Sequence, residues 1–111
     1  MEERRRSAWI GGSVLVRGDV VSKGDLQIDG QVQGTIEIGD HNLTIGNTAT
    51  VVANLVARTV TISGKVHGSV IGSAKVELKS TAEVLGDVTA PTFVMEDGAA
   101  LSGKVDTGPR K

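Results

Sequence analysis

The sequence predicts an all-β fold, a single-domain right-handed parallel β-helix (β-solenoid) of about six coils with a triangular cross-section. Two observations predict this fold. A five-residue pattern recurs along the chain at a nearly constant spacing. The composition is rich in Val, Ile and Gly, with one Phe, one Trp and no Tyr, which favours strands joined by tight corners. A chain of 111 residues leaves room for one domain.

The recurring pattern consists of an apolar residue, any residue, a small residue, any residue and a second apolar residue. Consecutive copies begin 16, 19, 15, 18 and 17 residues apart, so the repeat tolerates small insertions. A fixed internal period of this length is the signature of stacked coils. The copies begin at Val16, Val32, Val51, Val66, Val84 and Leu101.

Two further apolar segments keep the same period, which gives three short alternating segments per repeat. Alternation directs the apolar residues to one face of a strand and the polar residues to the other. Recurrence at constant spacing indicates parallel, in-register stacking and not hairpins, and the right hand follows from the general preference of parallel crossovers. The two segments contain the pairs Leu26/Ile28, Leu43/Ile45, Val60/Ile62, Val76/Leu78 and Phe93/Met95, and the starts Val20, Ile36, Leu55, Val70 and Val88.

The small residue at the centre of each copy, Gly or Ala53, has two interpretations. It points inward where the walls approach too closely for a larger side chain, or it marks a turn. Two other folds fit less well. A left-handed hexapeptide helix requires a period of six, and a β-sandwich does not keep three registers aligned over six copies.

The ends of the solenoid predict self-association. We expect a flexible N-terminal tail at 1–12, the β-helix at 13–106 and a short C-terminal tail at 107–111. Neither tail is long enough to cover a coil, so both ends expose strand edges and an apolar cross-section. Joining ends would continue the ladder and the core, which predicts a filament. The candidate polymer interface consists of Phe93, Leu101, Val105, Val14 and Val16.

Charge and composition limit the partners. A formal net charge of -1 provides no field for nucleic acid. The absence of Cys fits a reducing compartment, and no apolar run approaches the roughly 18 residues needed to span a bilayer, so we expect a cytoplasmic chain. Peripheral membrane contact is one interpretation of the N-terminal segment, and a solvated tail is the other. The candidate membrane contacts are Arg4, Arg5, Arg6, Trp9 and Ile10.

No spacing of residues in the sequence indicates an enzyme. His41 and His67 lie more than one coil apart without a catalytic neighbour, and the acidic residues lack the spacing of a calcium loop. We therefore predict no catalytic, cofactor or metal site. The alternative function is a binding module, for ice or carbohydrate, that acts without polymerisation. A ladder containing Thr44 and Thr61 would support ice binding, but the array breaks after two coils.

Three parts of the sequence closely resemble the bactofilin family. They are the run from Gly18 to Ile36, which contains Gly24-Asp25-Leu26-Gln27-Ile28-Asp29-Gly30, the run Val60-Thr61-Ile62-Ser63-Gly64-Lys65-Val66-His67-Gly68, and the closing run from Pro91 to Gly103. The resemblance covers about residues 13 to 106.

The resemblance implies a bacterial cytoskeletal protein that polymerises without nucleotide into non-polar filaments. Such filaments scaffold cell-wall and morphogenesis factors at the inner face of the cell membrane. It also implies an end contact, carried here by Phe93 and Leu101, although Leu101 stands where the family commonly has an aromatic residue. Both tails are minimal by comparison with the family.

Overall fold

The computed structural model describes residues 8–21, 24–38 and 41–106. These residues form one continuous sheet of thirteen strands without helices, and all its strand pairs are parallel. The strands are β1 (Ala8–Ile10), β2 (Leu15–Val21), β3 (Leu26–Ile28), β4 (Gln31–Glu37), β5 (Asn42–Ile45), β6 (Thr50–Ile62), β7 (Lys65–His67), β8 (Val70–Leu78), β9 (Glu83–Leu85), β10 (Val88–Thr89), β11 (Phe93–Met95), β12 (Ala100–Ser102) and β13 (Val105–Asp106).

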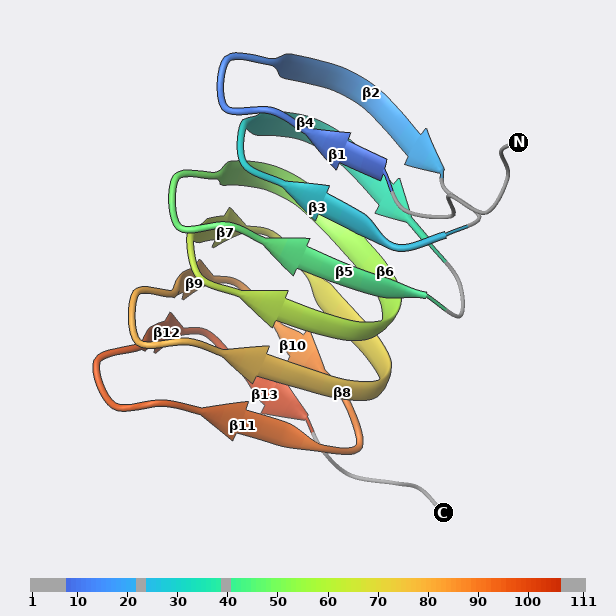
Figure 1. Cartoon of the computed structure of the whole chain (residues 1–111). Helices are drawn as coiled ribbons and strands as arrows, with labels where there is room; N and C mark the ends of the chain where they lie inside the picture. The colour runs from blue at the N-terminus through green and yellow to red at the C-terminus, as the bar shows by residue number, and fades with distance from the viewer. Residues whose placement is uncertain (1–7, 22–23, 39–40, 107–111) are drawn as a thin grey trace.

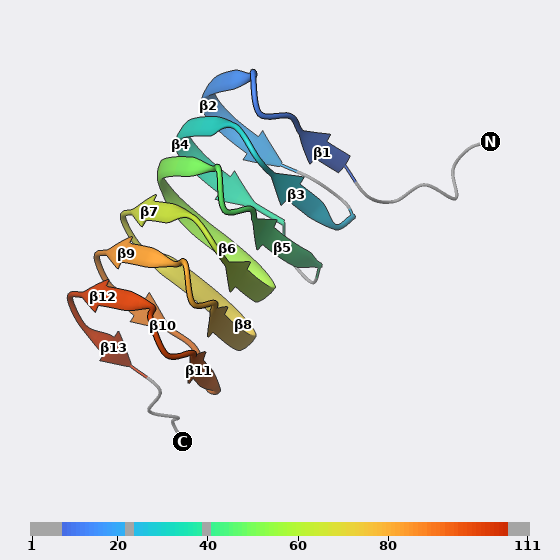
Figure 2. The same cartoon turned by 60° about the vertical axis from the view of Figure 1, so that its left-hand side comes forward.

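The chain winds as a right-handed β-helix from the N-terminal coil to the C-terminal coil (Figure 1). Each of its six coils contributes a segment to each of three faces. Face A contains β1, β3, β5, the end of β6, the end of β8 and β11. Face B contains the starts of β2, β4 and β6, then β7, β9 and β12. The three-sided stack confirms the predicted fold class (Figure 2).

Face C completes each coil. It contains the ends of β2 and β4, the middle of β6, the start of β8, β10 and β13. A single strand can therefore pass from one face to the next, and β6 pairs in turn with strands of all three faces. An irregularity between Ala57 and Thr59, opposite β8, marks its passage from face C to face A.

The interior is an aliphatic core of stacked columns. The apolar pairs that the alternation predicted point inward, and in the middle coils their side chains are fully buried, for example Val32, Ile36 and Leu43. No polar or charged residue among the described ones is buried. The outer surfaces consequently carry the polar residues of each strand.

The glycines between faces B and C mark a turn. Gly34 has a φ of 136°, a conformation that side chains with a Cβ rarely adopt. A Cβ on Gly34 would lie 2.0 Å from the carbonyl oxygen of Gly18 in the preceding coil. For these glycines the inward interpretation is therefore wrong, because the steric limit comes from the neighbouring coil and not from an opposite wall.

Ala53 occupies the same position in the third coil without a positive φ. Here β6 continues through the corner as an extended strand, and the Ala53 side chain is buried. A small inward side chain is thus accommodated at this corner only where the backbone stays extended.

Corners between faces A and B account for part of the variation in repeat length. Four positions separate Ile28 from Val32, whereas six separate Ile45 from Val51. The longer corners close with a turn, such as the one in which the Ala49 N–H donates to the Gly46 carbonyl at 3.0 Å. The Thr48 hydroxyl in this turn donates to the Asp29 carbonyl of the shorter corner at 2.9 Å. Long and short corners therefore pack against each other, and the apolar side chains of successive coils stay stacked in register.

The β-helix includes residues that lie before the expected start at 13. β1 pairs in register with β3, with Trp9 beside Gln27 and Ile10 beside Ile28. The apolar-x-apolar segment of face A thus begins one coil before Leu26, the first position that the repeat predicts for it. Residues 1–7 and 107–111, which include Arg4, Arg5 and Arg6 and most of the two expected tails, lie outside the described residues.

Candidate assembly surfaces at the two ends

The C-terminal coil leaves the core open. In this coil Phe93 stacks on Val76, Leu101 on Val84 and Val105 on Val88. These three valines of the fifth coil are at most 1% exposed, whereas Val105 is 39% exposed and Phe93 and Leu101 are only partly buried. The structure therefore brings all three predicted C-terminal interface residues to one apolar end.

Two side chains of this end are larger than the residues on which they stack. Phe93 and Leu101 each cover a valine of the fifth coil, and Met95, which is 43% exposed, covers Leu78. Larger side chains at the last coil add apolar area to the open cross-section. Burying that area in a contact with another molecule would be favourable by about 25 cal/mol per Å².

The N-terminal coil is open in the same way. Val16 and Val20 are partly buried, although Val32 and Ile36 directly beneath them are fully buried. Val14 is 44% exposed and lies above Gly30, a position that later coils fill with Gly or Ala. A Cβ at Gly30 would meet the Val14 carbonyl oxygen at 2.4 Å. Val14 is therefore the largest side chain of this column.

Strand edges accompany these apolar ends. Among the described strands, β1 and β2 pair only toward the second coil, and β11, β12 and β13 pair only toward the fifth. Both ends of the rod therefore present strand edges beside exposed core residues, which is the combination that favours addition of further strands.

Trp9 and Ile10 point in opposite directions from β1. Trp9 is 67% exposed, and its indole N–H donates to the carboxylate of Asp29, which also accepts a hydrogen bond from the Gln27 amide at 3.2 Å. Ile10 instead packs against the core. The two residues therefore do not form one outer contact, and Trp9 alone is available to a surface. None of the residues that the structure describes belongs to a helix long and apolar enough to cross a membrane.

A charged cluster links the last two coils on face A. The Lys79 ammonium lies 2.9 Å from the Glu77 carboxylate and 3.4 Å from that of Glu96. The hydrogen bond from Lys79 lowers the pKa of Glu77 below its ordinary value, and the same bond raises the pKa of Lys79. This cluster ties together outer side chains of neighbouring coils and has no reactive geometry.

The side chains that suggested other functions lie as follows. Thr44 and Thr61 are neighbours in the outer column of face A, which reads Gln27, Thr44, Thr61, Glu77 and Val94. The threonine array is two coils long. Within the described ranges no group of three or more His, Cys, Asp or Glu residues could hold a metal ion.

Residues 8–106 match the family model of the bactofilins, described as polymer-forming cytoskeletal proteins. The chain belongs to the bactofilin family.

Curated relatives and solved structures agree with this assignment. The chain is 37% identical over 97 residues to bactofilin BacO of Myxococcus xanthus, covering 87% of the chain and 76% of BacO. It is 31% identical over 99 residues to BacP of the same organism, covering 89% of the chain and 41% of BacP. The chain thus spans most of one curated relative and less than half of the other.

Two solved bactofilins share the fold. A Thermus thermophilus bactofilin, solved by cryo-electron microscopy as double helical filaments, matches with a TM-score of 0.80 at 31% identity, covering 88% of this chain and 98% of that one. The cytoskeletal bactofilin BacA, solved by solid-state NMR, matches with a TM-score of 0.84 at 32% identity, covering 96% and 100%. This bactofilin is therefore a member of a cytoskeletal, filament-forming family.

Proposed function

We propose that this bactofilin assembles end to end, without nucleotide, into filaments that act as a cytoplasmic scaffold. One observation carries the proposal. The inward columns are fully buried in the middle coils and become exposed at both terminal coils, at Val14 and Val16 on one side and at Phe93, Leu101 and Val105 on the other. Stacking one end on another would bury these side chains.

The free energy for such a joint comes from the ends themselves. Burial of apolar surface and pairing of strand edges are both favourable and require no chemical step. Nucleotide hydrolysis is therefore unnecessary for assembly. The filaments of the Thermus thermophilus relative support a polymer built from this fold.

The polar outer faces suit a scaffold. They repeat along a filament and so present the same side chains many times to cell-wall or morphogenesis proteins. Repetition converts weak individual contacts into stable attachment, because each bound copy raises the effective concentration of the next. We propose that the filament positions such factors at the cell envelope.

Imaging of the purified protein without nucleotide tests the assembly. We expect filaments from the wild type and short rods from Leu101→Arg and Phe93→Arg, which place a charge in the joint. Ser102→Arg is the matched control, because Ser102 is the next residue of β12 and is exposed. Filaments from Leu101→Arg and Phe93→Arg would remove these residues from the joint, and rods from the wild type would refute the proposal.

We also propose peripheral contact of the filament with the inner face of the membrane through Trp9 and the basic residues Arg4, Arg5 and Arg6. Indole rings suit the membrane interface, and each basic residue near an anionic surface contributes about 1 kcal/mol. Sedimentation with vesicles containing anionic lipid tests this contact. We expect Trp9→Ala to sediment less than Thr44→Ala, a control in the same outer column. Equal sedimentation would exclude Trp9 from the contact.

A further inference from the structure

Face A of the N-terminal coil depends on one short strand. β1 supplies this face, whereas β2 supplies both face B and face C of the same coil (Figure 2). β1 pairs in register with β3, so that Ala8 lies beside Leu26 and Ile10 beside Ile28. Leu26 and Ile28 are 3% and 0% exposed. The cover over these two side chains therefore consists of a strand of three residues.

β1 has few contacts that could hold it on the rod. Among the described strands it pairs with β3 alone, and Gly11 and Gly12, which follow it, contribute no side chain. A short strand that pairs on one side contributes little stability by itself. Ile10 packs against the core, and the remaining polar contacts of β1 converge on one residue of the second coil, Asp29.

Asp29 holds β1 through its side chain and through its backbone. Its carboxylate accepts one hydrogen bond from the Trp9 indole N–H and another, at 3.2 Å, from the Gln27 amide. Its backbone N–H donates to the Ile10 carbonyl at 2.7 Å. The indole ring turns back over Gly11, where an added Cβ would lie 3.4 Å from the ring. Trp9 thus connects the end of β1 with the corner of the next coil.

The third coil fixes Asp29 in turn. The Thr48 hydroxyl donates to the Asp29 carbonyl at 2.9 Å. The Asp29 carboxylate packs on the backbone of Gly46, because a Cβ added there would lie 2.0 Å from its Oδ1 atom. Any larger residue at this position would displace the carboxylate from its place beside the indole. Asp29 therefore connects three successive coils.

We propose that Asp29 is a positioning residue for assembly, because its bond to Trp9 keeps β1 on the rod and completes the N-terminal assembly surface. The inference rests on the end-to-end assembly proposed above. With β1 in place, all three faces end at the first coil. With β1 detached, face A would end at the second coil, about 4.8 Å further along the rod. A second molecule could then not contact all three faces together.

The position of β1 should set the concentration at which filaments form. Only molecules with β1 in place present a complete N-terminal end, and the apparent affinity of the joint falls with the fraction of such molecules. Hydrogen bonds to a charged group stabilise more than bonds between neutral groups. Loss of the bond from the indole to the carboxylate should therefore raise the critical concentration for filaments about tenfold.

Two substitutions remove this bond from opposite sides. Trp9→Phe keeps a ring without an N–H, and Asp29→Ala keeps the indole without its acceptor. We expect both to raise the critical concentration, and the double variant Trp9→Phe/Asp29→Ala to raise it no further, since both changes remove the same bond. Asp29→Asn retains a carbonyl oxygen as acceptor and should assemble nearly as the wild type does. Sedimentation and electron microscopy, without lipid, measure the critical concentration.

The indole also reports on β1 directly, because Trp9 is the single tryptophan of the chain. Below the critical concentration, its fluorescence anisotropy should fall in Asp29→Ala and stay near the wild-type value in Asp29→Asn. Thermal unfolding of the same dispersed rods establishes that each variant is folded at the temperature of assembly. A purely structural role of Asp29 would leave the critical concentration of folded rods unchanged.

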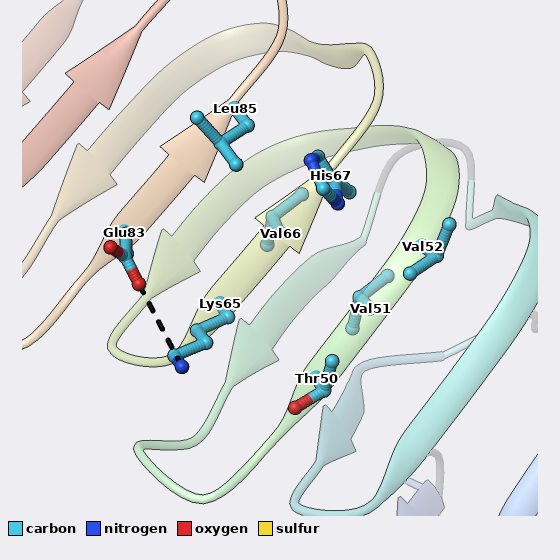
Figure 3. Close-up of a pocket in the computed structure, with 8 residues that line it drawn as sticks. All are labelled: Thr50, Val51, Val52, Lys65, Val66, His67, Glu83 and Leu85. Carbon is cyan, nitrogen blue, oxygen red and sulfur yellow. Dashed lines mark ion pairs between the residues drawn. The ribbon is translucent and has the colours of Figure 1, made fainter.

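Two controls remove contacts between coils that do not involve β1. Asp25 precedes β3 as Asp29 follows it, and its carboxylate accepts a hydrogen bond from the Asn42 N–H at 3.0 Å. On face B, the Lys65 ammonium lies 3.9 Å from the Glu83 carboxylate of the next coil. This pair lines a groove of about 260 Å³ over the third to fifth coils, away from β1 (Figure 3). Asp25→Ala and Lys65→Ala should therefore assemble at the wild-type concentration.

The outcomes separate this inference from the proposed function. Absence of filaments in the wild type would overturn both. Wild-type filaments with an unchanged critical concentration in Trp9→Phe and Asp29→Ala would overturn the role of Asp29 alone, and Trp9→Phe decides if Asp29→Ala does not fold. An equal rise in the two controls would also overturn it, because any lost contact between coils would then have the same effect.

Discussion

The middle coils and the terminal coils are built from the same kinds of residue and differ in what lies above them. Val84 in the fifth coil is 1% exposed because Leu101 covers it, whereas Leu101 itself is only partly buried. Apolar side chains in the inner coils are therefore stabilised by the next coil, whereas no described residue covers the last coil. The difference shows that the same repeat gives fully buried columns in the middle of the rod and partly exposed apolar residues at its end.

The largest effect is expected from truncating the middle of the core. Leu55 is fully buried, and Leu55→Ala should reduce the free energy of unfolding by about 2–5 kcal/mol. Leu101→Ala should reduce the free energy of unfolding by less, because the Leu101 side chain already contacts solvent. Chemical denaturation, at a protein concentration below that of assembly, compares the two variants. Equal losses of unfolding free energy would show that the side chains of the terminal coil are as fully packed as those of the middle coils.

A corner glycine of the middle coils should be the next most sensitive position. Gly86 has a φ of 142°, and a Cβ there would lie 2.0 Å from the Gly68 carbonyl oxygen. Gly86→Ala should therefore cost about 1–3 kcal/mol of backbone strain, with the steric clash in addition. Gly18 has a φ of 123°, but a Cβ on it would meet nothing within 4 Å.

Gly18→Ala should accordingly lower the stability by the cost of backbone strain alone, without the steric clash. Thermal unfolding of the two variants measures the difference between the first coil and the fifth. A Gly18→Ala variant that is as unstable as Gly86→Ala would show that the contact with the preceding coil does not limit this corner.

The smallest effect concerns the charged cluster between the last two coils. Because Lys79 lowers the pKa of Glu77, the carboxylate stabilises the folded chain above its unfolded pKa of 4.5, and this contribution is lost as the pH falls through the folded pKa. The raised pKa of Lys79 contributes below its unfolded pKa of 10.5 and is lost as the pH rises through the folded value. Both contributions are therefore present together only between these two values.

Glu77→Gln removes the pairing and tests this pH dependence. We expect its stability relative to the wild type to be lowest near neutral pH and to approach the wild-type value in acid. Thermal midpoints measured from pH 3 to pH 7, within the range where carboxylates titrate, compare the two proteins. A constant difference over this range would contradict the ion pairing.

The sequence predicted the parts of the fold that depend on periodicity. The inward columns, the number of coils and the three C-terminal residues at the open end follow from alternation and a fixed repeat. The positive φ of Gly34 did not follow, because composition alone cannot distinguish an opposite wall from a neighbouring coil. β1 was also missed, since a strand of three residues next to two glycines has no periodicity of its own.

The outer surface was harder to predict than the core. Val52, His67 and Leu85 are separated by 15 and 18 residues, so their alignment depends on how each corner absorbs its insertions. Trp9 and Ile10 were grouped as neighbours in sequence, but strand alternation sends them to opposite sides. The sequence predicted the outer column of face A that contains Thr44 and Thr61, but the contacts on face B depend on corners of unequal length.

Hydrogen exchange of the terminal strands tests the central account most directly. The backbone amides of Phe93, Met95 and Leu101 should exchange rapidly in dispersed rods and slowly in filaments, because they alternate along β11 and β12 with residues that bond to the fifth coil and the joint would pair their open edge. The amides of β5 and β7 should be protected equally in both. Terminal amides that exchange as fast in filaments as in rods would contradict assembly through the ends.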